Sequence, residues 1–203
     1  METFKEYTLK LLEGKTLSFV FKRLLKIFKR LLVFTFFIFL LGFTAPQRFM
    51  IPVENARREN WDIESFWYWP WGKSQVHKGV DIFAEEGTNV LASTYGIVLY
   101  SGQSINGGNI IYILGPKWRI HYYAHLKELN SSACSFVTKG EIIGKVGCTG
   151  NAVGKPAHLH YTIETYIPYF WRWDSDFLGW QKMFYLNPID YMNEYLENNV
   201  SKT

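Results

Sequence analysis

The sequence is poor in cysteine, with two residues of this type, Cys134 and Cys148, among 203. So few thiols exclude a disulfide-rich scaffold and a four-cysteine metal site, so a bound metal would need histidine and carboxylate ligands. No internal repeat is evident, and the seven prolines and 20% charged residues are typical of ordinary folded proteins. The length suits one domain with an appendage.

The larger part of the chain also lacks an excess of positive charge. The whole sequence has 22 Lys and Arg against 18 Asp and Glu, a net charge of +4. Residues 1–30 hold eight of these basic and three of these acidic residues, which leaves 14 basic and 15 acidic residues in the remainder. Nucleic-acid-binding domains concentrate Lys and Arg on their folded surface. We therefore expect no nucleic-acid partner.

One long uncharged run lies near the N-terminus, at Leu31–Phe43 (LLVFTFFIFLLGF). Upstream of it, apolar residues recur at helical spacing with Lys and Arg between them, which is typical of a basic amphipathic helix at a membrane surface. A spanning helix needs about 20 apolar residues, and the run approaches this length if Lys29 and Arg30 snorkel. We predict a cytoplasmic basic amphipathic segment over residues 1–30 and a single transmembrane anchor over residues 31–46.

The Lys and Arg residues before the run predict a cytoplasmic N-terminus and an exported remainder. A cleaved signal peptide has the same polarity, but Pro46 directly follows its one candidate cleavage site at Ala45. A buried core helix would have to explain why thirteen uncharged residues show no polar face. We favour the uncleaved anchor, which places the protein in the cell membrane as a single-pass protein with its folded domain outside the cytoplasm.

The exported part is organised as short strands. Segments rich in β-branched and aromatic residues alternate with glycines at turns, and helical periodicity is scarce between residues 75 and 165. The predicted strands are Val80–Ala84, Asn89–Tyr100, Asn109–Leu114, Trp118–Leu126, Glu141–Val146 and His158–Glu164. This pattern predicts a mainly β fold, a compact antiparallel β-sheet domain. A short C-terminal helix is predicted over Asn187–Asn198.

Two aromatic-rich segments, Trp61–Trp71 and Tyr166–Tyr185, lie on either side of this β region. Both could border a binding groove, or they could pack under long loops or rest against a membrane, and the sequence leaves these alternatives open. The predicted organisation is a linker and aromatic loop over residues 47–69, the β domain over 70–168 and an aromatic-rich extension over 169–203.

All five histidines lie between His77 and His160. His158 and His160 are two residues apart in a predicted strand, so their side chains share one face with backbones about 6.6 Å apart. The same alternation places His121 and His125 together on one face of another strand. Unrelated core or surface histidines would need these spacings to coincide by chance, so the spacing favours one shared site.

His77 and Asp81 are four residues apart, about 13 Å in an extended strand, which is too far for both to reach one small ion. Gly79 lies between them and tolerates a turn or bulge, so we expect the backbone to depart from regular strand there. Two imidazoles and one carboxylate are a common ligand set for catalytic zinc, with a fourth position open to water. Surplus histidines can then move protons or stabilise an oxyanion in metal-assisted hydrolysis.

These residues resemble the motifs of the lysostaphin-like zinc metallopeptidases, also called LytM-type murein endopeptidases (metallopeptidase family 23). HKGVDI from His77 is similar to the first metal motif, and YAHL from Tyr123 is similar to the central one. GCTG from Gly147, followed by GKP and by HLH ending at His160, is similar to the last. The resemblance covers roughly residues 70–168, about half of the chain.

The resemblance implies that His77, Asp81 and His160 bind Zn²⁺ and that His125 and His158 are catalytic histidines that bind no metal. It also implies a compact antiparallel β fold of the barrel-sandwich-hybrid type, with the metal in a groove between loops. The implied activity is endopeptidase cleavage of peptides in bacterial peptidoglycan, which makes a peptidoglycan peptide the expected substrate. Nothing in the sequence identifies a protein activator.

Three points depart from the family pattern or stay open. His121 stands where many relatives have a small hydroxyl residue, and we expect it to pack or to support the site from behind. Cys148 could pair with Cys134 in an oxidising compartment, a pairing that two cysteines leave open. A non-catalytic envelope scaffold or wall-binding protein with the same fold is the alternative function, but it would not require all five histidine and aspartate positions to be filled.

Overall fold

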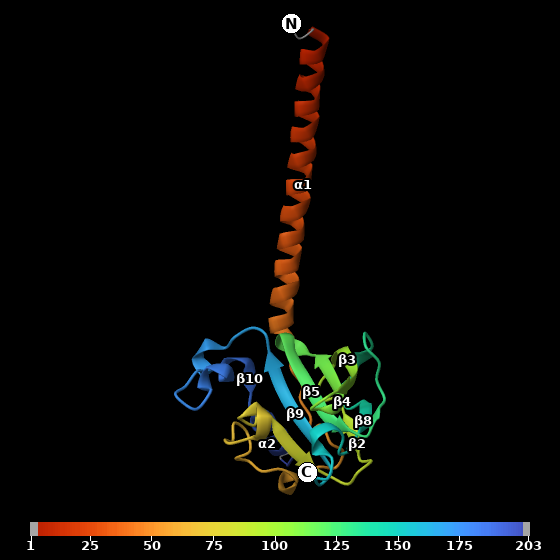
Figure 1. Ribbon diagram of the computed structural model, residues 1–203, viewed down its shortest axis with the longest axis vertical. Coiled ribbons are helices and arrows are strands. Elements are labelled where there is room, and N and C mark those ends of the chain that lie inside the picture. The colour runs from red at the N-terminus through yellow and green to blue at the C-terminus, as the bar shows by residue number, and fades with distance from the viewer. Residues whose placement is uncertain (1–3, 201–203) are drawn as a thin grey trace. The chain divides into compact units, whose positions relative to one another are not determined.

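The computed structural model describes residues 4–200 of the chain (Figure 1). The chain divides into two compact units, Met1–Thr44 and Ala45–Thr203. The first unit contains one α-helix, α1 (Phe4–Thr44), shown in red and orange in Figure 1. From Leu17 onward most of the apolar side chains of α1 are exposed, and the basic helix expected within residues 1–30 is part of α1.

No helix of the described residues has a stretch that is both long and apolar enough to cross a membrane. The predicted transmembrane anchor over residues 31–46 is therefore not confirmed. The uncharged run Leu31–Phe43 extends only about 20 Å at 1.5 Å per helical residue, against a hydrocarbon core of about 30 Å. Lys29 and Arg30 lie directly before it.

The second unit consists mainly of antiparallel strands in two sheets (Figure 1). The larger sheet has the order β1-β9-β5-β4-β3-β7, with β10 also paired to β9, and the smaller sheet has the order β2-β8-β6. The strands are β1 (Val80–Phe83), β2 (Asn89–Leu91), β3 (Gly96–Ser104), β4 (Gly108–Leu114), β5 (Arg119–Leu126), β6 (Glu128–Leu129), β7 (Phe136–Val137), β8 (Ile142–Lys145), β9 (His158–Thr165) and β10 (Tyr185–Leu186). The expectation of a mainly antiparallel β domain is confirmed.

Short helices connect these strands. The 3-10 helices are η1 (Arg58–Asn60), η2 (Gly72–Ser74), η3 (Pro116–Trp118), η4 (Gly150–Ala152), η5 (Phe170–Arg172) and η6 (Gly179–Phe184). The helix expected at the C-terminus is α2 (Pro188–Val200). It begins there because Pro188 suits a first helical turn and because the side chain of Asn187 accepts a hydrogen bond from the backbone N–H of Ile189 (3.1 Å).

The core lies on one face of the central strand β9, and the residues of interest lie on the other. Leu159, Tyr161 and Ile163 are fully buried in the core cluster. His158 and His160, which alternate with these core residues along the strand, project to the opposite face, as the two-residue period of a strand requires. Burial of the core residues thus fixes the register of β9 and, with it, the face on which its histidines stand.

Both segments flanking the β domain are packed into the same compact unit. Ile51, Val53 and Trp61 are 2 to 4% exposed and belong to the main core, and α2 adds Ile189 and Met192 to it. The predicted linker and aromatic loop over residues 47–69 therefore contributes residues to this core.

Candidate metal centre

Asp81 and His160 come together because strands β1 and β9 are paired. In their antiparallel register Asp81 lies opposite His160, so both side chains stand on one face of the sheet. His77 precedes β1 and reaches this pair because the backbone bends at Gly79. A Cβ atom at position 79 would lie 2.4 Å from the carbonyl oxygen of Tyr161, so only glycine fits there. The expected departure from regular strand between His77 and Asp81 is confirmed.

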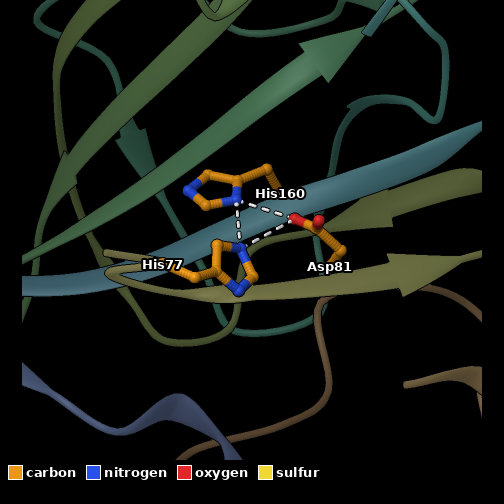
Figure 2. A group of neighbouring side chains, drawn as sticks. All are labelled: His77, Asp81 and His160. Atoms are coloured by element: carbon orange, nitrogen blue, oxygen red, sulfur yellow. Dashed lines mark hydrogen bonds and ion pairs between the residues drawn. The ribbon is translucent and has the colours of Figure 1, made fainter. Parts of the chain in front are cut away.

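Three potential ligand atoms converge at this point (Figure 2). Nε2 of His77 lies 3.1 Å from Nδ1 of His160 and 3.2 Å from Oδ1 of Asp81, and Nδ1 of His160 lies 2.8 Å from the same oxygen. A tetrahedral zinc ion with bonds of about 2.0 to 2.1 Å holds its ligand atoms about 3.4 Å apart. The donor types and the three separations therefore fit a zinc ion.

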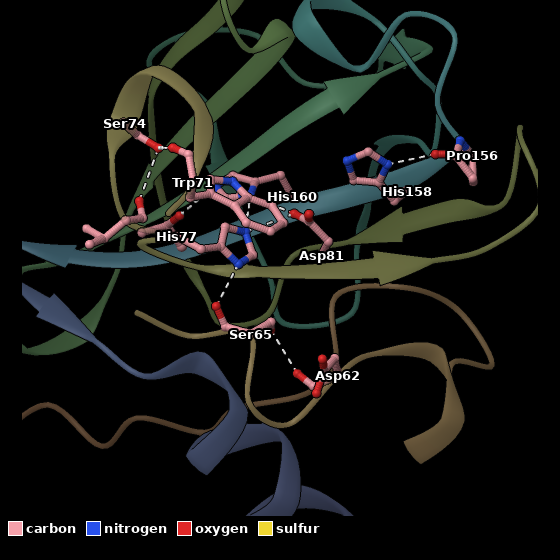
Figure 3. A network of polar contacts seen from close by, with 11 residues as sticks. Asp62, Ser65, Trp71, Ser74, His77, Asp81, Pro156, His158 and His160 are labelled. Atoms are coloured by element: carbon pink, nitrogen blue, oxygen red, sulfur yellow. Dashed lines mark hydrogen bonds and ion pairs between the residues drawn. The ribbon is translucent and has the colours of Figure 1, made fainter. Parts of the chain in front are cut away.

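Further contacts fix how the two imidazoles face the centre (Figure 3). Nδ1 of His77 lies 2.9 Å from the carbonyl oxygen of Ser65, so Nδ1–H donates to that carbonyl and Nε2 is left free to bind a metal. The ring of Trp71 stacks on His77 with centroids 4.2 Å apart. Nε2 of His160 lies 3.2 Å from the hydroxyl of Thr162, which leaves Nδ1 facing the centre. These outer contacts preorganise the ligand set.

The electrostatics of the cluster also favour a cation. Burial acts to raise the pKa of the Asp81 carboxyl, but its contacts with His160 and His77 outweigh burial and hold the pKa well below the usual range. Burial lowers the pKa of His160, although the neighbouring Asp81 opposes this shift. An ionised carboxylate and a neutral imidazole are the protonation states that metal binding requires.

His125 and His158 lie beside the cluster, with their ring centroids 5.0 Å apart. Nδ1 of His125 lies 2.9 Å from the carbonyl oxygen of Thr149. Figure 3 shows the corresponding contact of His158, whose Nδ1 lies 2.7 Å from the carbonyl oxygen of Pro156. A carbonyl oxygen can only accept, so each Nδ1 carries a proton and each Nε2 is a free proton acceptor in the neutral ring. Burial lowers the pKa of His125 to about 4. Both side chains can therefore transfer protons next to a metal-bound water.

His125 reaches this face through an irregularity in β5. Between Tyr123 and Leu126 the strand has one residue more than β4 has between Ile111 and Asn109, which is a β-bulge. His125 itself has φ +65°, in the left-handed region, a conformation that costs on the order of 1 kcal/mol. The expectation that His125 shares a face with His121 was wrong, because the bulge reverses the alternation between them.

His121 lies on the core side of the sheet, away from the cluster. It is fully buried, and its Nδ1 accepts a hydrogen bond from the hydroxyl of Tyr161 (2.6 Å), which in turn accepts one from Ser93 (2.8 Å). Burial lowers the pKa of His121 to about 3, and its Nε2 has no hydrogen-bond partner among the described residues. Its packing role agrees with the interpretation that we favoured.

A cavity of about 220 Å³ opens onto the cluster. Asp81, His125, His158 and His160 line it together with Trp71, Lys155 and others. Of the two aromatic segments left open by the sequence, Trp61–Trp71 borders this cavity through Trp71, and no residue of Tyr166–Tyr185 lines it. Trp71 and the backbone carbonyls that orient the histidines were missed individually, since carbonyl groups carry no sequence signal.

The two cysteines do not pair. Cys134 is exposed and Cys148 is partly buried, and both are free thiols. The structure brings together the five residues expected at the site, and their individual roles stay predictions.

Comparison with known proteins supports the resemblance. Residues 75–169 match the family model described as peptidase family M23. The chain is 34% identical over 123 residues to the L-Ala–D-Glu endopeptidase of Bacillus subtilis, covering 56% of this chain and 36% of that protein. It is 34% identical over 90 residues to the peptidoglycan DD-endopeptidase ShyC of Vibrio cholerae, covering 44% and 20%. The chain thus spans about a third or less of the length of these curated relatives.

Solved structures agree with these matches. The catalytic domain of lysostaphin from Staphylococcus simulans aligns with a TM-score of 0.51 at 27% identity, over 63% of this chain and 87% of that chain. These matches support the expected resemblance to metallo-endopeptidases. Residues 75–169 of this chain thus match peptidase family M23, in agreement with the resemblance that the sequence motifs indicated.

Proposed function

We propose that this protein is a zinc metallo-endopeptidase that hydrolyses peptide bonds in peptidoglycan. The observation that carries the proposal is the convergence of His77, Asp81 and His160 beside two further histidines that face the same cavity. The names of the relatives, an L-Ala–D-Glu endopeptidase and a peptidoglycan DD-endopeptidase, support the substrate class. Because peptidoglycan is an extracytoplasmic polymer, the domain would act outside the cytoplasm, and localisation at the cell membrane stays a prediction.

In this proposal His77, Asp81 and His160 would hold Zn²⁺, which would supply Lewis-acid chemistry, polarising a carbonyl and lowering the pKa of a bound water toward about 7. The hydrogen bonds from His77 to Ser65 and from His160 to Thr162 keep the ligand nitrogens aimed at the centre.

His125 and His158 perform the proton transfers. Each donates Nδ1–H to a backbone carbonyl and keeps Nε2 available. An unprotonated Nε2 accepts a proton from the attacking water, and the resulting imidazolium returns it to the amine leaving group. The second ring, standing 5.0 Å from the first, is placed to hydrogen-bond the developing oxyanion once its Nε2 is protonated.

The test uses the full chain with purified peptidoglycan. New amino termini and the masses of the released muropeptides are measured, and the bound metal is quantified in the same preparation. Fragments cut at one type of peptide bond, with about one zinc per chain, are expected. A zinc-loaded protein that binds peptidoglycan but releases no new amino termini would contradict the proposal and favour the non-catalytic scaffold.

A further inference from the structure

The cavity at the metal cluster adjoins a second one. This outer cavity has a volume of about 330 Å³ and shares five lining residues with the inner one: Trp71, Ser74, Asn106, Asn151 and Lys155. Because five residues line both cavities, the two lie next to each other, and we call them together the groove. A peptide whose scissile bond lies at His77, Asp81 and His160 has its neighbouring residues in this groove.

The walls of the groove come from two loops that are distant in sequence. In the first loop, which includes η2, the N–H of Trp71 donates to the carbonyl of Gln75 (2.8 Å). In the second, which follows η4, the N–H of Lys155 donates to the carbonyl of Ala152 (2.9 Å). The N–H of Asn151 donates across to the carbonyl of Asn106 (2.9 Å), which ties the second loop to the β3–β4 turn. The backbones that present the groove residues are therefore fixed by hydrogen bonds.

The charged side chains of the outer cavity are two lysines, Lys73 from the first loop and Lys155 from the second. Its other lining residues are neutral: Pro70, Trp71, Gly72, Ser74, Asn106 and Asn151. Both lysines are exposed, and no carboxylate of the described residues lies within ion-pair distance of either. Lys127 and Lys182, by contrast, pair with Glu86 and with Asp174 and Asp176.

The inner cavity does not neutralise this charge. Its one carboxylate is Asp81, which is committed to His77 and His160 and to the metal that they would hold. Two ammonium groups and a divalent cation in one groove attract an anionic ligand. Since the ligand of a peptidase groove is a peptide, the matching anion is a carboxylate on that peptide.

We propose that Lys73 and Lys155 form a subsite that binds a free carboxylate of the substrate close to the scissile bond, so that the enzyme prefers acidic peptides. The inference rests on the proposed function and deepens it by naming the substrate class: peptides with an acidic side chain or a free terminal carboxylate next to the cleaved bond. Recognition is by charge at two lysines that line the same cavity, and the neutral Asn106 and Asn151, which line it too, carry amide groups that can donate hydrogen bonds.

The test compares matched peptides of equal length that contain a cleavable bond of the type identified in peptidoglycan digests. One carries the free carboxylate and the other carries the corresponding carboxamide. We expect the wild-type full chain to cleave the acidic peptide with a kcat/KM about tenfold higher, and expect this ratio to fall as salt is raised. Lys73→Gln and Lys155→Gln should each lower kcat/KM for the acidic peptide about 2- to 5-fold, as loss of a partly solvated ion pair does.

Two further variants separate charge from loop structure. Lys155→Arg keeps the charge and should retain the preference, and the Lys73→Gln/Lys155→Gln double variant should bring the ratio of the two peptides close to one. Lys139→Gln removes an exposed lysine that lines neither cavity and should leave the ratio as in the wild type. Equal kcat/KM for the two wild-type reactions, or equal losses on both peptides in the double variant, would overturn the subsite.

A binding measurement distinguishes failure of the subsite from failure of the proposed activity. The full chain with His125→Ala, loaded with zinc, is titrated with each peptide by calorimetry, so no turnover is needed. Tighter binding of the acidic peptide that is lost with Lys73→Gln/Lys155→Gln supports the subsite even if the wild type cleaves neither peptide. Equal affinity for both peptides refutes the subsite even if the wild type is an active peptidase.

Discussion

Gly79 holds the two halves of the metal cluster at their observed separation, so Gly79→Ala gives a direct test of the site. A Cβ atom at this position would lie 2.4 Å from the carbonyl oxygen of Tyr161, 2.6 Å from the hydroxyl of Thr162 and 3.1 Å from Cε1 of His160. The first obstacle is backbone of the paired strand β9 and cannot rotate away. Relieving the contact to an ordinary distance of about 3.4 Å requires a shift of about 1 Å between His77–Gly79 and β9.

A shift of this size exceeds the tolerance of a zinc site, in which ligand distances hold to within about 0.2 Å. We therefore expect Gly79→Ala to lower zinc affinity by at least about tenfold. The overpacked strand pair should also lose about 1 to 3 kcal/mol of unfolding free energy. Zinc affinity is measured by competition with a chromophoric chelator, and stability is measured by denaturant unfolding of the metal-free protein.

The matched control is Gly87→Ala. Gly87 has φ +94° and nothing within 4 Å of an added Cβ, so the substitution adds backbone strain without a clash near the cluster. It should cost about 1 kcal/mol of stability and leave zinc affinity unchanged. If Gly79→Ala bound zinc as tightly as the wild type, the close approach of His77 and β9 would not control the ligand geometry.

The remaining predictions concern other parts of the site and core. His125→Ala should keep its zinc and lower turnover about 10²- to 10⁴-fold, whereas His160→Ala should lose the metal. Metal content and peptide hydrolysis are measured for both variants. Full activity in zinc-loaded His125→Ala would refute the role of this ring. Trp71→Ala removes the ring stacked on His77, so it should weaken zinc binding up to about tenfold and raise KM. Trp69 lines neither cavity, so Trp69→Ala should change neither zinc binding nor KM. His121 has a folded pKa of about 3, below its usual value near 6.5, so its contribution to stability is complete above pH 6.5 and is lost as the pH falls toward 3. The loss is of the order of 5 kcal/mol. His121→Gln should make the unfolding free energy depend less steeply on pH in that range, and an unchanged slope would contradict this assignment.

Residue composition predicted the central strands of the fold but not its shortest ones. The segments around β1, β4, β5, β8 and β9 have four or more residues each, which is long enough for an enrichment in β-branched and aromatic residues between turns to show. Strands β6, β7 and β10 have two residues each, and such an enrichment cannot be recognised in so short a run. Asn89–Tyr100 was predicted as one strand and is divided by Ala92–Tyr95 into β2 and β3, which lie in different sheets.

Alternation alone also failed at the bulge of β5. From the sequence His121 and His125 occupy the same parity, yet one packs in the core against Tyr161 and the other faces the metal cluster. A bulge is decided by how a strand pairs with its neighbour, here the register shift between β4 and β5, and such pairing is long-range information.

The sequence by itself pointed to the side chains gathered at the site, because close spacing along the chain carries this information: His77 and Asp81 flank one glycine, and His158 and His160 share one strand face. Spacing did not choose between His158 and His160 as a metal ligand, and that choice came from the family resemblance. Tertiary structure decided how they act. The pairing of β1 with β9 set the separation of Asp81 and His160, and the backbone carbonyls of Ser65 and Thr149 set which nitrogen of His77 and of His125 is free. The placement of Lys73 and Lys155 at one cavity was likewise decided by folding, since two residues 82 positions apart in the sequence line one cavity only in the folded chain.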